Sequence, residues 1–164
     1  KLTLVKAETG LFEKNYDIIF TSGTKIEFNS GGQWTEISCK GSAVPAALIP
    51  AAIAKYVKEN YANTKILGIE KDSNRFDVKL SNNLELEFDK KFNWKEIDCE
   101  HSTLYQEVPN VLVPPAIKNY VTSNYSQNRI VKISQDRDGW SVDLDNKIEI
   151  EFDKTFKVRE IDLG

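Results

Sequence analysis

Two pairs of carboxylates stand at a spacing that could serve chemistry. Glu85 and Glu87 are two residues apart, and Glu149 and Glu151 repeat the pattern. In a β-strand such side chains lie on one face, about 6.6 Å apart. A pair of this kind could carry acid–base chemistry or bind a hard cation. The alternative is the outward half of an alternating strand with Lys79 as a cross-strand partner, which we favour because the pair recurs.

Two further sets of reactive side chains fall short of a site. Asp136–Gly139 begins like a calcium loop, but the twelfth position is Lys147 where such a loop needs Glu. We expect a plain β-turn there, with an adventitious Ca²⁺ as the alternative. A Cys99–His101 nucleophile would need an orienting group and an oxyanion site. We expect His101 to be an exposed linker residue, and we predict no catalytic residue, no metal site and no cofactor.

Two tryptophans carry the strongest indication of a binding surface. Trp94 shares strand parity with Glu96, whereas Ile97 has the opposite parity. If Ile97 faces a helix, Trp94 lies on the open face of a sheet, and Trp34 is its counterpart earlier in the chain. Exposed Trp among charged residues is typical of a binding face. The alternative is a β-bulge or a strand end that turns both indoles into an edge cluster.

The chain repeats itself. Val44–Glu100 and Val108–Gly164 align without a gap, with 25 identities in 57 positions, and Lys25–Cys39 forms a partial copy without a helix. Repeats of this kind build scaffolds, so a specific site is expected where the copies differ, toward the open sheet of the first two units. We expect a strand-only unit over residues 1–42 and full units over 43–102 and 103–164.

Each full copy reads as one helix followed by four strands. Apolar residues recur at helical spacing over Pro50–Tyr61, where Pro50 suits the first helical turn. Pro45 predicts a separate short turn, because a helix interior does not tolerate Pro50. The residues that follow alternate between apolar and polar, with hairpin signals between them. The expected fold class is α+β, with tandem units of a helix plus a four-stranded antiparallel sheet and the helices packed on one sheet face.

Composition excludes several classes of protein. A net charge of −3 over 164 residues provides no basic face for nucleic acid. No apolar run reaches the ~18 residues of a membrane helix. The sequence contains no Met, which suggests a processed N-terminus with a signal peptide removed.

Cys39 and Cys99 are equivalent under the repeat and would lie roughly 19 Å apart in a continuous sheet. We therefore predict two unpaired, mostly buried cysteines.

The pattern resembles the PepSY-like periplasmic proteins, which have a β-lactamase-inhibitor-like fold. The resemblance rests on a helix reading P…I..Y…NY, a hairpin, and then EFDK…WKEID, in register in both copies. The family usually has Gly in the turn after FD, whereas Lys91–Asn93 and Thr155–Lys157 fill it here and only Gly31–Gly32 keeps glycine. The resemblance implies export to the periplasm or cell envelope of a Gram-negative bacterium and no known catalysis.

We therefore predict a non-catalytic envelope protein whose open antiparallel sheet face recognises a protein or peptide partner. An inhibitor-like role follows only as an analogy at the level of fold. The alternative is a small-ligand or Ca²⁺-responsive envelope sensor that uses the acidic face. The candidate partner-binding residues are Trp34, Trp94, Lys79, Glu85, Glu87 and Glu96.

Overall fold

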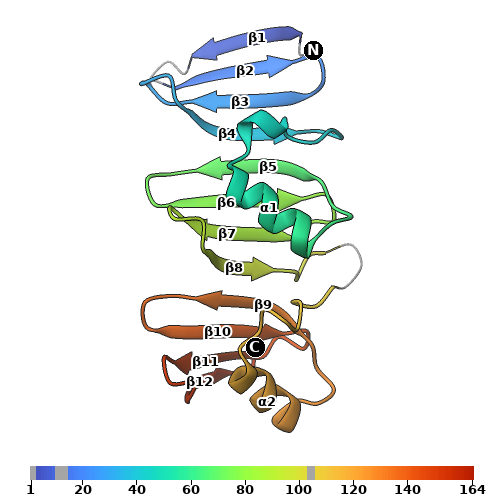
Figure 1. Cartoon of the computed structure of the whole chain (residues 1–164), viewed down its shortest axis with the longest axis vertical. Coiled ribbons are helices and arrows are strands. Elements are labelled where there is room, and N and C mark those ends of the chain that lie inside the picture. The colour runs from blue at the N-terminus through green and yellow to red at the C-terminus, as the bar shows by residue number, and fades with distance from the viewer. Residues whose placement is uncertain (1–2, 10–14, 103–105) are drawn as a thin grey trace. The chain divides into compact units, whose positions relative to one another are not determined.

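The computed structural model describes residues 3–9, 15–102 and 106–164, and these residues are mostly β-structure (Figure 1). Twelve strands occur in the described ranges: β1 (Leu4–Thr9), β2 (Tyr16–Phe20), β3 (Thr24–Phe28), β4 (Trp34–Cys39), β5 (Ile66–Lys71), β6 (Arg75–Leu80), β7 (Glu85–Asp89), β8 (Trp94–Asp98), β9 (Ile130–Gln135), β10 (Gly139–Leu144), β11 (Glu149–Asp153) and β12 (Val158–Asp162). The helices described are η1 (Ala46–Leu48, a 3₁₀ turn), α1 (Ala51–Asn60) and α2 (Pro115–Asn124).

The expected α+β class, with tandem helix-plus-sheet units, is wrong because the fold is mainly β. Each α-helix has only ten residues. Pro50 and Pro114 stand at the N-caps with extended ψ values of 132° and 136°, so neither helix can begin earlier. The prolines that indicate the helices in the sequence therefore also keep them short. The separate turn expected at Pro45 is confirmed as η1, whose N-cap is Pro45.

Contacts divide the chain into two compact units. The first comprises Lys1–Ser81 and Phe88–Asn93, and the second comprises Asn82–Glu87 and Trp94–Gly164. Strand β7 therefore contributes residues to both. The division at 1–42, 43–102 and 103–164 stays a prediction.

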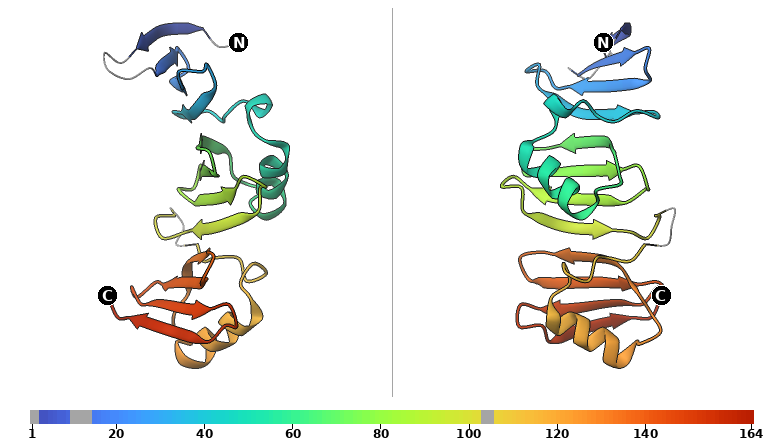
Figure 2. Two further views of the ribbon diagram at one scale, coloured as in Figure 1. Left: turned by 90° about the vertical axis from the view of Figure 1, so that its left-hand side faces the viewer. Right: turned by 45° about the vertical axis from the view of Figure 1, so that its right-hand side comes forward.

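In the first unit, β1 to β6 pair antiparallel in sequence order. One apolar row runs across β2–β6 and comprises Ile18, Ile26, Ile37, Ile69 and Val78. Helix α1 lies over β5 and β6 on one side of the sheet (Figures 1 and 2) and buries Ile53 and Val57. Its Tyr56 ring meets Phe88 edge to face at 5.2 Å between centroids. Burial of Ile53 or Val57 stabilises the unit by roughly 1.5–3 kcal/mol for each side chain.

The second unit repeats this packing. Strands β8 to β12 pair antiparallel, and their apolar row comprises Ile97, Ile133, Val142, Ile150 and Ile161. Helix α2 buries Ile117 and Val121, and its Tyr120 ring meets Phe152 edge to face at 5.5 Å. Within each unit, strand alternation therefore places the apolar row on the helix side and the neighbouring polar residues on the other face.

One hairpin turn occurs three times, and its residues explain the missing glycines. Asn29, Asp89 and Asp153 each accept backbone N–H bonds through Oδ1 from residues two and four positions later. The third residue after each has φ between 63° and 74°: Gly32, Phe92 and Phe156. A phenylalanine in this region costs about 1 kcal/mol or more. Ring contacts offset the cost, at 5.2 Å between Phe76 and Phe92 and 6.1 Å between Trp140 and Phe156.

Both cysteines are unpaired and buried, as the sequence predicts. Among the described residues, no helix is long and apolar enough to cross a membrane.

Candidate functional site: an acidic sheet face

The first unit carries an unbroken row of carboxylates on the sheet face that α1 does not cover. Glu27 pairs with Glu36 across β3 and β4, and Glu36 pairs with Glu70 across β4 and β5. Each lies next to a member of the apolar row, so alternation turns it to the opposite face. In the order β2 to β6, the row is Asp17, Glu27, Glu36, Glu70 and Asp77.

Positive charge reaches both ends of this row but not its centre: Arg75 Nε lies 3.1 Å from Asp77 Oδ2 on β6, and Lys25 lies at the other end. Lys25 Nζ lies 2.9 Å from Asp17 Oδ2 and donates to Glu27 Oε1. These bonds, first to Glu27 and then to Asp17, raise the pKa of the Lys25 ammonium above its ordinary range. The contacts fix Lys25 over β2 and β3, which leaves the carboxylates on β4 and β5 without a neutralising partner of this kind.

Glu36 and Glu70 form the uncompensated centre of the row. No hydrogen bond or ion pair to either carboxylate occurs among the residues that the structure describes. Burial raises the pKa of Glu36 above its ordinary value, and the carboxylates of Glu27 and Glu70 raise it further. Like charges directly opposite each other on neighbouring strands destabilise a sheet. This face could therefore attract a cation or a positively charged partner.

The second unit has its own acidic face, arranged in two rows around one lysine. One row comprises Glu96, Ser134, Ser141, Glu151 and Glu160, and the other comprises Asp98, Lys132, Asp143, Glu149 and Asp162. Lys132 Nζ lies 3.0 Å from Glu96 Oε1 and 3.7 Å from Asp98 Oδ2. Burial, and next the Glu149 carboxylate, raise the pKa of Asp143 to about 6.

The expectation that Trp34 lies on the open face is wrong, and a β-bulge is the reason. Glu27 pairs with Glu36, but Phe28 pairs with Trp34, so Thr35 is the extra residue of the bulge. Trp34 thereby joins the side of Ile26 and Phe28, where Lys71 Nζ lies 4.0 Å from its ring centroid. The sequence alternative of a bulge is thus correct for Trp34.

Trp94 is also held by apolar contacts. Its ring lies 6.0 Å from that of Trp140, and Trp140 shares strand parity with buried Val142. Gln135 Nε2 donates to the Trp94 backbone oxygen at 2.8 Å. Whether either indole contacts a partner stays a prediction, but both rings are half-buried in the protein itself.

The other predicted binding residues lie in different units. Lys79 of the first unit is exposed. It lies in the row beside the carboxylates, where Ser38 pairs with Gly68 and Gly68 pairs with Lys79. Glu85 is exposed and Glu87 half-buried on β7, and both belong to the second unit. Glu96 is half-buried and bound to Lys132. The sequence analysis missed the Glu27–Glu36–Glu70 pairing, because it depends on strand register.

The other reactive groups adopt ordinary structural roles. Asp136 Oδ1 accepts backbone N–H bonds from Asp138 and Gly139 at 2.6 and 2.9 Å, and these bonds, Asp138 first, lower the pKa of its carboxyl group. This is the β-turn that the sequence predicts. Cys99 is buried, which raises the pKa of its thiol to about 12, whereas His101 is exposed. No group of three or more acidic, Cys or His side chains is gathered for a metal in the described ranges.

The sequence matches one family of proteins. Residues 14–93 and 74–160 each match the family described as "Putative beta-lactamase-inhibitor-like, PepSY-like". Because these matches cover most of the sequence, the chain belongs to the PepSY-like family, as the sequence pattern indicates. Among curated proteins, none matches the chain.

Three solved structures resemble the chain. A "putative calcium-regulated periplasmic protein" from Bacteroides thetaiotaomicron is 33% identical with a TM-score of 0.64, covering 73% of this chain and 94% of its own. A periplasmic protein of unknown function from Bacteroides vulgatus is 32% identical, with a TM-score of 0.64 and coverages of 72% and 94%. A third, a periplasmic protein of the DUF2874 family from Bacteroides vulgatus, is 34% identical, with a TM-score of 0.63 and coverages of 74% and 95%. The protein is accordingly an exported protein of the periplasm, which confirms the predicted location.

Proposed function

We propose that the protein is a non-catalytic periplasmic binding protein whose acidic sheet face recognises a protein or peptide partner that carries basic groups. The observation that supports this most is the direct pairing of Glu36 with Glu70 in the centre of the carboxylate row. A sheet that keeps like charges opposite each other loses stability, and a cationic partner would recover it. An inhibitor-like role, in which the partner is an enzyme, is the narrower form of this proposal.

Most of the binding residues predicted from the sequence also contribute to the proposed binding surface. Lys79 borders the carboxylate row and would select against an entirely cationic partner surface. Glu85, Glu87 and Glu96 give the second unit the same acidic character. In this proposal Glu36 and Glu70, rather than the tryptophans, form the centre of the partner-binding surface, because Trp34 lies on the side of the apolar row.

Titration with a charged peptide tests this function. The probe is a synthetic peptide of alternating lysine and threonine, measured by calorimetry with the full chain. We expect saturable binding that weakens as salt rises, and a loss of about tenfold or more for the double variant Glu36→Gln, Glu70→Gln. The matched control is Glu59→Gln, which removes one carboxylate from α1, where Glu59 lies 3.9 Å from Lys55 Nζ. Equal binding by the double variant and the native protein would contradict the proposal.

Calcium responsiveness is the second candidate function. It is supported by the description of the relative from Bacteroides thetaiotaomicron as calcium-regulated, together with the two acidic faces. Ca²⁺ prefers several oxygen ligands around one point, whereas these carboxylates are spread along rows. A rise in melting temperature with CaCl₂ but not with MgCl₂ would support this candidate through mass action, and no difference between the two salts would exclude it.

A further inference from the structure

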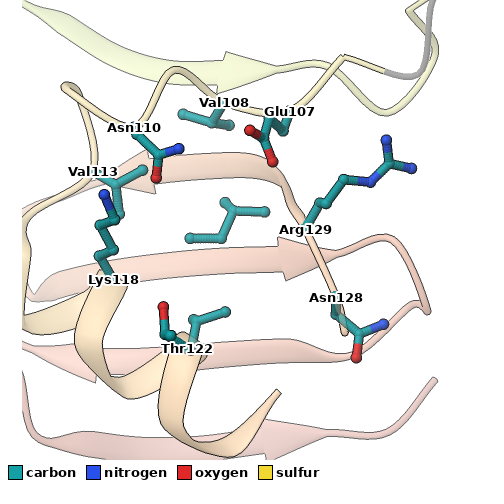
Figure 3. Close-up of a pocket in the computed structure, with 10 residues that line it drawn as sticks. Glu107, Val108, Asn110, Val113, Lys118, Thr122, Asn128 and Arg129 are labelled. Carbon is teal, nitrogen blue, oxygen red and sulfur yellow. The ribbon is translucent and has the colours of Figure 1, made fainter. Parts of the chain in front are cut away.

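A pocket of about 270 Å³ lies in the second unit, between α2, residues 107–113 and the start of β9 (Figure 3). Val108, Val121 and Ile130 provide its apolar lining. The volume is just below the roughly 300–1,000 Å³ of pockets that enclose drug-sized ligands. The pocket therefore suits a molecule smaller than a drug, with an apolar part that can cover this lining.

Charges of both signs line opposite sides of the pocket. Figure 3 shows Lys118 on one side and Glu107 beside Arg129 on the other. No hydrogen bond or ion pair to the Lys118 ammonium or the Glu107 carboxylate occurs in the part of the chain that the structure describes. Arg129 is bound to Asp145. Lys118 on one side and Glu107 on the other, separated by apolar lining, therefore complement a ligand with an opposite charge at each end.

The side with Arg129 is held in place from outside the pocket. Asn128 Nδ2 donates to Asp145 Oδ1 at 3.0 Å, and Arg129 Nε donates to Asp145 Oδ2 at 3.0 Å. These bonds, that of Asn128 first, keep the pKa of Asp145 below its usual range. A polar rim fixed by supporting hydrogen bonds binds with less loss of side-chain entropy.

Comparing the two sequence copies shows which lining residues of the pocket are shared and which occur only in the second copy. The apolar lining is kept in the first copy, where Val44, Val57 and Ile66 stand at the equivalent positions. Two of the three charges are not kept, because Ala43 and Ala54 stand where Glu107 and Lys118 occur, whereas Lys65 stands where Arg129 occurs. The first copy forms the same helix-on-sheet packing without these charges. Packing alone therefore does not explain Glu107 and Lys118.

We propose that this pocket binds a small zwitterion of dipeptide size with apolar side chains. Its ammonium group would face Glu107, its carboxylate would face Lys118, and its side chains would cover the valine and isoleucine lining. This role goes beyond the proposed function, since the carboxylate row lies in the first unit and every lining residue of the pocket lies in the second.

Calorimetric titration of the full chain with the dipeptide alanyl-leucine tests the proposal. We expect one saturable site per chain. N-acetylation of the dipeptide removes the ammonium charge, and amidation removes the carboxylate, so each analogue should bind about tenfold more weakly. Equal binding of the dipeptide and both analogues, or no saturable binding at millimolar concentrations, would overturn the proposal.

Two variants test which lining residue binds the carboxylate of the dipeptide and which binds its ammonium group. Lys118→Ala should abolish the preference for the free carboxylate over the amide, and Glu107→Ala should abolish the preference for the free amine over the acetylated form. Both introduce the residue that the first copy already carries at that position, so the fold accommodates them. Lys58→Ala on α1 is the matched control and should change neither preference. Variants that keep both preferences would place the ligand elsewhere.

Discussion

Glu36 lies directly opposite Glu70 across strands β4 and β5, and neither carboxylate has a hydrogen bond or ion pair among the described residues. The register that creates this pair also aligns Ile37 with Ile69 on the other face, where both are buried. A shift of one residue would separate the charges but would expose the isoleucines. Apolar burial, roughly 1.5–3 kcal/mol for each isoleucine, exceeds the charge repulsion of up to about 1 kcal/mol and fixes the register.

Neutralising one of the two glutamates should stabilise the protein. Glu36→Gln removes the repulsion while keeping the shape of the side chain, so we expect the free energy of unfolding to rise by about 0.3–1 kcal/mol. The gain should shrink in high salt because screening already weakens the repulsion. Urea denaturation at low and high salt measures both effects, with Glu59→Gln as the control. A loss of stability in Glu36→Gln would mean that the carboxylate has a favourable partner.

The stability of the second unit should depend on the ionisation of Asp143. Burial, and next Glu149, raise its pKa from the ordinary 3.8 to about 6, while Lys132 acts in the opposite direction. Between these two values the folded state binds the proton more tightly than the unfolded state, so stability falls as pH rises from 3.8 to about 6. Asp143→Asn should remove this component. Denaturation of both proteins across that range gives the difference, and identical pH profiles would contradict the assignment.

The cysteines should be inert in the folded protein. Cys99 is buried, and its thiol has a pKa of about 12, so almost no thiolate exists at neutral pH. We expect a thiol reagent to label both cysteines slowly in buffer and rapidly in urea, and a reducing agent to leave the melting temperature unchanged. Rapid labelling of Cys99 in buffer, or a lower melting temperature after reduction, would show an exposed or a paired thiol.

Trp94 should contribute to stability through its contact with Trp140. Because the indole is half-buried, we expect Trp94→Ala to cost about 2 kcal/mol, less than the roughly 3–5 kcal/mol of a fully buried ring. Trp94→Phe keeps a ring against Trp140 and should cost less. If Trp94→Ala instead kept full stability and lost peptide binding, the indole would be a partner contact.

Local features were predictable because they depend on residues close in the sequence. Helix α1 spans Ala51–Asn60 within the expected Pro50–Tyr61, since proline spacing and apolar periodicity determine it. Strand pairing was not predictable, because the extra residue at Thr35 reverses the side on which Trp34 lies. The expected α+β class is wrong because each α-helix has only ten residues, against twelve strands in the described ranges.

The candidate sites show the same limit. The recurring pair Glu85 and Glu87 was visible in the sequence, whereas the pairing of Glu36 with Glu70 joins distant segments through register. Glu107 and Lys118 of the pocket could have been found as a difference between the copies, since alanines replace them in the first. That difference lies on the helix α2 side of its unit, away from the open sheet where the sequence led us to expect a site.

The most direct test of the acidic face is to map the bound peptide on the protein by NMR. Backbone amide shifts are followed while the lysine–threonine peptide is titrated into the full chain. We predict that the largest shifts fall on β3, β4 and β5 around Glu27, Glu36 and Glu70, and that α1 changes little. Largest shifts on α1 or around the pocket of the second unit, or no shifts at all, would contradict recognition by the acidic sheet face.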